Sequence, residues 1–489
     1  MTQLPSAGAE FRAGAAYAWA ALGGAPEPLA RLSPVVRDDT LAARLPVRAL
    51  ARACVGVCTL AAAELAALRT GGAVPHARVD DGAVAAAFTS ERHLLVDRRA
   101  PVTFAPLSRF WRTADGWVRT HANYPHHRER LLAALGIPES AATVDAVAAR
   151  LAALPGIEAE EAVYAAGGLA VALRTPREWA AHPQAAAVAG LPLVARERLG
   201  GGAPRALPPL VDGPLLPASG VRVLDLTRVI AGPVATRTLA LLGADVLRVD
   251  PPHCPELPDQ HADTGFGKRS TTLDLGGRAG LRTLDELLAG ADVVVTGYRP
   301  GALDRFGLSP EALAERRPGL VVAQLSAWGA RGPWAHRRGF DSLVQVATGI
   351  AALEGSPERP GALPAQALDH GTGYLLAAAV LRALTEQGTD GAGGTRVARL
   401  ALARTAGWLT GTVDGDGAWG GARGAGSAAH DPADSCDVTT SYDPADRLAH
   451  TDSPLGRLRH ALPPVTFTGG PVNWARPPGP WGADAPVWR

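Results

Sequence analysis

Residues 221–250 read VRVLDLTRVIAGPVATRTLALLGADVLRVD, and the spacing of their apolar residues changes twice. The runs at 221–227 and 245–250 are short and rich in Val and Leu, which is typical of buried strands. The segment between them, 232–243, has helical spacing and carries a proline in its first turn, where proline is tolerated. A strand, a helix and a second strand in this order predict two parallel strands joined by a right-handed crossover.

The same alternation continues to residue 328 and predicts an α/β fold with a Rossmann-like parallel sheet. A helix is predicted near 277–289, a strand at 292–297, a helix near 309–316 and a strand at 319–328. Ligands of such sheets bind at the carboxyl ends of the strands. The loops predicted at those ends are rich in Gly, Pro and Arg: TRVIAGP (227–233), VDPPH (249–253), TGYRPG (296–301) and SAWGARGP (326–333).

The chain before this sheet has a different organisation. LAAAELAALR at 60–69 is its clearest helical pattern. Within 107–135, two short aromatic and β-branched runs flank Asp115-Gly116, which predicts a hairpin leading into a helix. Two further helices are predicted, at 142–154 and 158–174.

These patterns divide the chain into six predicted parts. They are a helical segment at 1–105, a small α+β domain at 106–200, a Pro- and Gly-rich linker at 201–220, the α/β domain at 221–410, a low-complexity flexible loop at 411–437, and an extended Trp- and Pro-rich strap at 438–489.

Composition limits the classes of function. A net charge of +1 over 489 residues offers no electrostatic basis for binding nucleic acid or an anionic membrane. The N-terminus lacks a signal-peptide pattern, and no apolar run approaches the ~20 residues of a membrane span, so a cytoplasmic protein is expected. The four cysteines form no CxxC pair, and the i,i+4 spacing of Cys54 and Cys58 predicts two buried helical thiols.

Two stretches look like known phosphate-binding motifs, but neither meets the requirements of its motif. The one GxGxxG, at Gly415, Gly417 and Gly420, lies in the low-complexity loop and neither follows a strand nor opens a helix. GFGKRS at 265–270 is not a P-loop, because Ala262 occupies the place of the first glycine. His121, His126 and His127 form a cluster, for which a polar surface or interface is favoured over zinc because no cysteine or acidic ligand completes a familiar spacing. No metal site is predicted.

Asp369 opens a strongly apolar helix, and two interpretations of it remain open. The first is an ordinary helix N-cap. The second is a nucleophilic carboxylate, kept ionised by the helix dipole. Gly371 and Gly373 in the first turn favour the second interpretation, because glycine costs helix stability unless something must approach the backbone closely.

Six stretches in order resemble the family III CoA-transferases, whose relatives include α-methylacyl-CoA racemase. The resemblance covers about 220 to 410, which makes 221–410 the expected CoA-binding catalytic domain. The stretches are VLDLTRVIAGPVATRTLALLGADVLRVDPP (223–252), GKRSTTLDL (267–275), ADVVVTGYRPGALDRFGL (291–308), SAWGARGPW (326–334), GFDSLVQVATGIAALEG (339–355) and ALDHGTGYLLAAAVLRAL (367–384).

The resemblance implies the site and the substrates. Asp369 matches the family's catalytic aspartate, and coenzyme A or acyl-CoA is implied as substrate, with a carboxylic acid as its partner and no tightly bound cofactor. A homodimer is also implied. Lys268, the chain's only lysine, is implied either to touch a phosphate or to brace its loop. The implied CoA-binding residues are Arg228, Ala231, Lys268, Leu273, Tyr298, Arg299 and Arg305, of which the arginines suit phosphate groups.

The implied reaction moves CoA between an acyl-CoA and an acid through an aspartyl intermediate. An acyl-CoA racemase is the first alternative. It is disfavoured because Phe340 occupies the place of that branch's histidine, although His370 is a conceivable substitute. A CoA-binding protein without turnover is the second alternative. The small domain precedes the sheet domain here, unlike in the family, and 54–72 resembles a degenerate copy of 370–388 with Ala53 or Cys54 at the aspartate's place.

Overall fold

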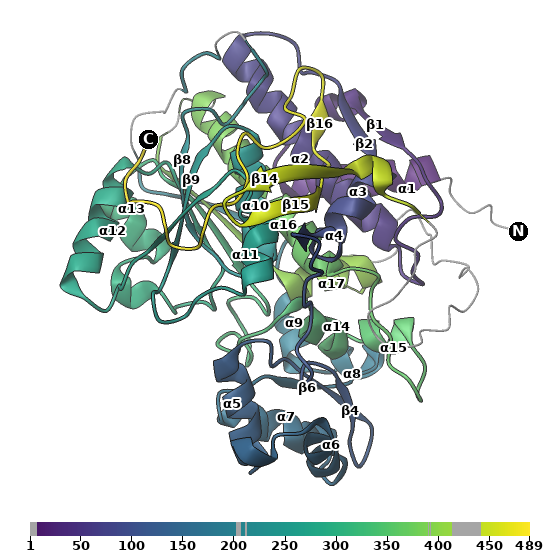
Figure 1. The fold of residues 1–489 in the computed structure, drawn as a ribbon. Helices are drawn as coiled ribbons and strands as arrows, with labels where there is room; N and C mark the ends of the chain where they lie inside the picture. Colours follow the sequence, from purple (N-terminus) through teal and green to yellow (C-terminus); the bar gives the residue numbers. More distant parts are fainter. Residues whose placement is uncertain (1–6, 202–206, 211–212, 390, 392, 413–441) are drawn as a thin grey trace, which may run out of the picture.

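The computed structural model describes residues 7–201, 207–210, 213–389, 391, 393–412 and 442–489. Its central layer is a seven-stranded sheet (Figure 1). The strands are β7 (Ala195–Leu199), β8 (Arg222–Leu226), β9 (Asp245–Asp250), β10 (Arg269–Thr272), β11 (Val293–Thr296), β12 (Val321–Ser326) and β13 (Thr395–Ala401). Their order is β10-β9-β8-β11-β12-β13-β7, with β7 antiparallel to β13 and all other neighbours parallel.

The direction of strand addition reverses between β8 and β11. The chain builds β9 and β10 on one side of β8, then returns to lay β11, β12 and β13 on the other side. The predicted strands are all present, so the α/β fold class is confirmed. The helices of this half are α10 (Ala231–Leu241), α11 (Pro258–Thr264), α12 (Arg278–Gly290), α13 (Pro310–Arg316), α14 (Asp341–Ala347), α15 (Ile350–Glu354), α16 (Ala367–Thr389) and α17 (Leu402–Thr410), with a 3-10 turn at Asp304–Phe306.

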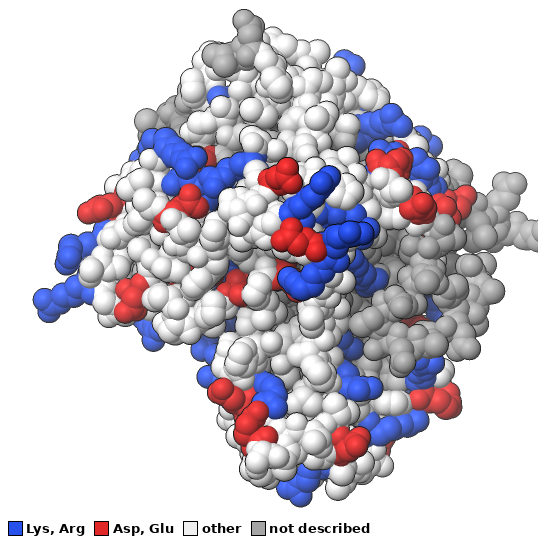
Figure 2. All heavy atoms as spheres, viewed as in Figure 1, with Lys and Arg blue, Asp and Glu red and all other residues white. Residues whose placement is uncertain are grey.

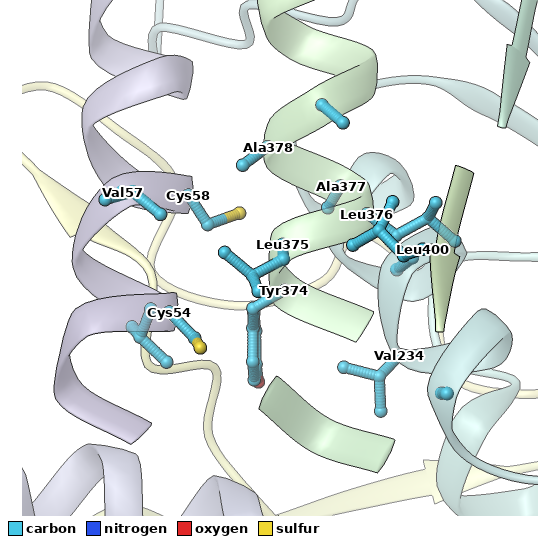
Figure 3. Packing of buried hydrophobic residues seen from close by; sticks show 14 of the residues in the cluster. Cys54, Val57, Cys58, Val234, Tyr374, Leu375, Leu376, Ala377, Ala378 and Leu400 are labelled. Atoms are coloured by element: carbon cyan, nitrogen blue, oxygen red, sulfur yellow. The ribbon is translucent and has the colours of Figure 1, made fainter. Parts of the chain in front are cut away.

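The N-terminal segment packs into the core of the sheet half. It comprises α1 (Ala7–Ala21), a 3-10 turn (Glu27–Arg31), β1 (Leu32–Val35), α2 (Val47–Thr70), β2 (Ala77–Asp80), α3 (Asp81–Phe88), α4 (Ser90–His93) and β3 (Leu95–Val96). Helix α2 lies along α16, and Figure 3 shows Cys54 and Cys58 of α2 directed toward Tyr374 and Leu375 of α16. The two buried helical thiols predicted from the sequence are therefore confirmed.

Helix α2 is the one helix among the described residues whose length and composition would suit a membrane span. However, 94% of its most apolar window is buried inside the molecule. Its apolar residues face α16 on one side and α1 and β2 on others, so it serves as a core helix that is apolar on nearly all sides.

A smaller α+β unit lies at one end of the molecule (Figure 1). Buried apolar residues between Leu107 and Val163 form a core of their own, whereas Leu169, Val171, Trp179 and Val188 belong to the core of the sheet half. The helix predicted at 158–174 ends early, because Gly167 adopts a φ of 77° and the chain then forms a strand. The elements here are β4 (Phe110–Arg112), β5 (Trp117–Thr120), α5 (Pro125–Ala134), a 3-10 turn (Glu139–Ala141), α6 (Val144–Ala152), α7 (Gly156–Ala165), β6 (Ala170–Ala172), α8 (Pro176–Ala180) and α9 (Pro183–Ala189).

The C-terminal residues pack against both the N-terminal segment and the central sheet. Strands β14 (Leu448–Ser453) and β15 (Gly456–Ala461) form a sheet with β3, and β16 (Thr466–Phe467) pairs with β2. The last residues then run across the edge of the central sheet. Three half-buried indoles fasten them there: Trp474 donates to the Arg237 carbonyl at 2.8 Å, Trp481 to Asp250 Oδ2 at 3.0 Å, and Trp488 to the Leu287 carbonyl at 2.9 Å. The predicted loop at 411–437 lies almost wholly outside the described residues.

The face of the molecule shown in Figure 2 has no large patch of side chains with the same charge. Basic and acidic side chains alternate over it, separated by uncharged residues. This distribution agrees with the net charge of +1.

Candidate active site

A cavity of about 580 Å³ lies at the carboxyl ends of β8, β9 and β11, where the strand order reverses. This is the place at which open parallel sheets bind ligands. Tyr124, His126 and His127 from the small unit form part of its wall. Seven of the eight predicted site residues line it, namely Arg228, Ala231, Leu273, Tyr298, Arg299, Arg305 and Asp369.

Asp369 stands between this cavity and a second one. It is the third residue of α16, so it is not an N-cap, and 6% of its surface is exposed. The second cavity has a volume of about 290 Å³, and its lining combines apolar side chains such as Phe104 and Phe110 with polar ones such as Arg119 and Gln260. Tyr124, Val229, Phe340 and Asp369 line both cavities, so the carboxyl group is reachable from two sides.

The two glycines after Asp369 serve helix packing. A Cβ added to Gly373 would lie 2.5 Å from the Ala231 carbonyl oxygen of α10, and one on Gly371 would lie 3.4 Å from Cys54 Sγ of α2. The predicted close approach to the backbone is therefore real, but protein elements make it. These contacts bring the start of α16 close to the loop after β8, which forms one wall of both cavities.

The electrostatics of Asp369 differ from the expectation of an ionised carboxylate. Burial raises the pKa of Asp369 well above its usual range, and the nearby carboxyls of Asp341 and Glu91 raise it further. Asp341 Oδ2 accepts a hydrogen bond from the Asp369 amide at 2.9 Å, and burial raises the pKa of Asp341 to about 6. Three carboxyls in one desolvated space outweigh the attraction of a helix dipole.

Val229 marks strain at the junction of the two cavities. Its φ of 69° lies in the left-handed region, which is costly for a β-branched residue. Its amide donates to Glu256 Oε2 at 3.1 Å, and the same carboxylate bonds Arg248 at 2.9 Å and accepts from the Tyr124 hydroxyl. Burial alone would raise the pKa of Glu256, but Arg248 and Arg228 overcome it and bring that pKa down to about 2.

The predicted arginines differ in how far their guanidinium groups are already engaged by protein partners, and so in how well they could bind an anion. Arg228 is engaged, since its guanidinium donates to the carbonyls of Cys254 at 2.6 Å and Pro255 at 2.7 Å. Arg299 makes a long contact of 3.4 Å with the His336 carbonyl. Arg305 is exposed and its guanidinium lies 4.6 Å from the centre of the Phe306 ring. Arg299 and Arg305 are therefore the better placed to bind phosphates.

Lys268 does not line either cavity. Its side chain is 2% exposed, and its ammonium group lies 3.1 Å from Asp225 Oδ2 and 3.0 Å from the Pro233 carbonyl. Burial lowers the pKa of Lys268 to about 8, although the Asp225 carboxylate acts in the opposite direction. Of the two roles left open by the sequence, the structure favours bracing, because Lys268 ties β10 to β8 and to the first turn of α10.

The predicted histidine cluster belongs to the site wall. The imidazole of His121 stacks on Phe340 with the ring centres 3.6 Å apart. Burial lowers the pKa of His121 to about 3, and the neighbouring Arg119 adds to this, while burial and His121 lower the pKa of His127 to about 2. These rings are therefore neutral at physiological pH, as aromatic packing partners of Phe340 would be.

The N-terminal half contains no second copy of the aspartate. Ala53 stands in α2 where the degenerate repeat would place it, and Arg52 beside it forms a buried ion pair with Asp81, each side chain being 1% exposed or less. Among the residues with which this half lines the cavities are Glu91 and Tyr124. Sequence analysis missed both, together with Glu256, because each acts across a sequence separation that no local pattern reports.

Comparison with known proteins supports the resemblance. Residues 218–446 match the family model for CoA-transferase family III. The recognition made from six ordered stretches is therefore confirmed for that part of the chain.

The curated relatives match over a limited length. A probable fatty acyl-CoA transferase of Mycobacterium tuberculosis is 35% identical over 194 residues, covering 37% of this chain and 49% of that protein. Mouse succinyl-CoA:glutarate CoA-transferase is 32% identical, covering 36% and 44%. Formyl-CoA:oxalate CoA-transferase of Streptomyces coelicolor is 35% identical, covering 36% and 45%. The chain thus spans about half the length of the curated relatives it matches.

Solved structures give the same partial coverage. A hypothetical protein from Mycobacterium tuberculosis is 34% identical, with a TM-score of 0.37, covering 40% of this chain and 57% of that one. A CAIB/BAIF family protein from Brucella suis is 30% identical, with a TM-score of 0.36, covering 40% and 55%.

Proposed function

Since residues 218–446 match CoA-transferase family III, we propose that this protein moves CoA from an acyl-CoA to a carboxylic acid. One observation carries the proposal. The Asp369 carboxyl group lies between a large cavity with cationic walls and a smaller one whose walls mix aromatic, aliphatic and polar side chains. The first suits the phosphates and pantetheine of CoA, and the second suits an acyl or acceptor group.

The proposed reaction uses Asp369 as a covalent carrier. Its carboxylate oxygen attacks the thioester carbonyl, the C–S bond breaks, and an aspartyl mixed anhydride and CoA thiolate form. The thiolate then attacks the aspartyl carbonyl, which releases the donor acid and leaves an aspartyl-CoA thioester. The acceptor carboxylate attacks the carbonyl of this thioester, the C–S bond breaks, and a second mixed anhydride and CoA thiolate form. The thiolate then attacks the acceptor's carbonyl in this anhydride, which gives the acceptor's CoA thioester and releases the Asp369 carboxylate. Attack requires the ionised carboxylate, so activity rises with pH through the raised pKa of Asp369.

Trapping tests this covalent step. Purified protein is incubated with a panel of acyl-CoAs and then with hydroxylamine, which converts an aspartyl anhydride or thioester to a hydroxamate. Peptide mass spectrometry is expected to find the hydroxamate on Asp369 and not in Asp369→Ala. The carboxylic acids tested as acceptors include oxalate, glutarate and malate, the acids named for relatives. Measurable CoA binding without any adduct would contradict the transferase.

Removing the Arg305 guanidinium tests the CoA site. Arg305→Ala is expected to weaken CoA binding by about tenfold, because a charge-assisted contact to phosphate is lost. The loss is expected to shrink as ionic strength rises, because salt screens exposed charges. Isothermal titration at two salt concentrations measures both effects. Arg278→Ala, an exposed arginine outside the cavity, is the matched control, and equal losses in both variants would count against the placement.

Two other activities remain to be separated from transfer. An acyl-CoA racemase would need a second base, and the candidates are His370 and the neutral His121 stacked on Phe340. Solvent deuterium appearing at the acyl α-carbon would identify it. A CoA-binding protein would show neither deuterium exchange nor a hydroxamate.

The homodimer and the cytoplasmic location stay predictions. Both halves of the proposed site come from one chain, so a dimer is not needed to complete it. Sedimentation equilibrium gives the mass of the assembly directly.

A further inference from the structure

Val229 lies where the two cavities meet, in a backbone conformation that is costly for valine. It is one of the four described residues that line both cavities, the others being Tyr124, Phe340 and Asp369. Its φ of 69° lies in the left-handed region, and such a conformation persists only where the surrounding structure imposes it. Helix α10 begins two residues later, so the conformation of Val229 also sets where the first turn of that helix lies.

The Glu256 carboxylate holds the Val229 backbone in this conformation. Glu256 stands in the loop between β9 and α11 and is 5% exposed. Its Oε2 accepts a hydrogen bond from the Val229 amide at 3.1 Å and another from Arg248 at 2.9 Å. Its Oε1 accepts one from the Leu257 amide at 3.0 Å and one from the Tyr124 hydroxyl. Both oxygens are therefore in use, and each of these partners is a donor, as an acceptor-only carboxylate requires.

Glu256 thereby joins three segments of the chain: the loop after β8, the loop after β9, and the small unit, where Tyr124 precedes α5. Arg228 closes this network, because its guanidinium lies 3.5 Å from Glu256 Oε1 and 5.2 Å from the centre of the Tyr124 ring. Glu256 itself is not among the described residues that line the two cavities. Its effect on a bound substrate would therefore pass through Val229 and Tyr124, which line both.

We propose that Glu256 is a positioning residue, which fixes the wall between the two cavities by holding Val229 and Tyr124 in place. The inference rests on the proposed function, in which the thioester carbonyl must meet the Asp369 carboxylate at this junction. Attack requires the reacting atoms to lie about 3–3.5 Å apart, and a displacement of about 1 Å can cost on the order of 100-fold in rate. A shift of Val229 would misplace the thioester, whereas Arg305, in the large cavity but outside this network, would keep its place.

Removing both carboxylate oxygens of Glu256 tests the proposal. Glu256→Leu keeps most of the side-chain volume, and Arg248 keeps its ion pair with Asp250 at 2.7 Å, so this variant is expected to fold. Its kcat is expected to fall about 100-fold, whereas its dissociation constant for CoA, measured by isothermal titration, is expected to stay within about twofold of the wild-type value. Glu256→Gln keeps one acceptor oxygen and is expected to lose only about tenfold in kcat. Equal losses of turnover and CoA affinity in these variants would overturn the proposal.

A glycine at position 229 separates positioning from general stability. Glycine adopts a φ of 69° without strain, so the segment then depends less on Glu256. Adding Val229→Gly to Glu256→Leu is expected to restore kcat by about tenfold, with Val229→Gly alone as the reference. Arg98→Gly is the matched control, because Arg98 has a φ of 70°, is exposed and lines neither cavity. Failure of Val229→Gly to restore kcat, or equal restoration by Arg98→Gly, would overturn the proposal.

Hydrogen exchange gives a readout that does not depend on turnover. In the first turn of α10, the Val234 amide donates to the Ile230 carbonyl at 2.8 Å. Exchange of the amides in this turn is expected to be about tenfold faster in Glu256→Leu, and to return toward the wild-type rate when Val229→Gly is added. If the wild type transfers no CoA but exchange follows this pattern, the positioning role stands and the proposed function does not. If exchange is unchanged in Glu256→Leu, the positioning role is excluded, whatever the activity.

Discussion

Asp369→Asn is expected to lower transferase turnover by at least about a thousandfold, because an amide cannot act as the nucleophile. The same variant is expected to be more stable than the wild type at about pH 8. In the folded protein the pKa of Asp369 is raised, whereas in the unfolded chain this carboxyl ionises near its usual pKa of about 4. Between those pKa values the unfolded state binds fewer protons, so wild-type stability falls as pH rises.

Asparagine does not ionise and escapes this loss. The melting temperature of Asp369→Asn is therefore expected to exceed the wild-type value by a few degrees at about pH 8, and by less at about pH 5. Differential scanning calorimetry at both pH values measures the difference. Asp145→Asn, on an exposed face of α6 away from both cavities, is the control and is expected to show neither effect. Full turnover in Asp369→Asn would refute the proposed mechanism.

Lys268→Ala is expected to destabilise the protein by about 3–5 kcal/mol, the usual result of leaving one partner of a buried ion pair unpaired. Asp225 is fully buried, and with the lysine gone its carboxylate keeps only the hydroxyls of Thr227 and Thr236 and the Thr227 amide. Chemical denaturation at about pH 7 measures the loss. At that pH the lysine, whose pKa is about 8, is charged in the wild type.

The double variant separates charge from packing. Lys268→Met with Asp225→Asn removes both charges and is expected to recover most of the lost stability, since an ion pair replaced as a unit leaves no buried charge behind. Neither variant is expected to change CoA affinity directly, because Lys268 lies outside the cavity. A large loss of CoA binding at unchanged stability would show instead that Lys268 contacts a phosphate of CoA.

The sheet half was predictable because its signals are local. The spacing of apolar residues in 221–250 reports strand and helix without reference to any other part of the chain. Once the strands are known, the loops at their carboxyl ends follow. Arg228, Tyr298 and Arg305 were assigned to the site by the resemblance to the family III CoA-transferases. These positions were predicted from the sequence and all line the cavity.

The charge state of Asp369 was not predictable because its causes are remote. The sequence offers a helix start, and a helix start favours a negative charge. The opposing contributions come from burial and from two carboxyls, of which Glu91 stands far earlier in the chain. The function of Gly371 and Gly373 was misjudged for the same reason, because the groups that approach them belong to α2 and α10.

The pairing of α2 with α16 also sets the order in which the chain can fold. Glu64 of α2 and Arg382 of α16 are in contact although 318 positions separate them. Such contacts have a high loop-closure cost and slow folding. At a synthesis rate of about 5–20 residues per second, α2 leaves the ribosome roughly 15–60 s before its partner helix. Throughout that interval α2 lacks the surface of α16 that covers it, so this long apolar helix is open to non-native apolar contacts until α16 has been made.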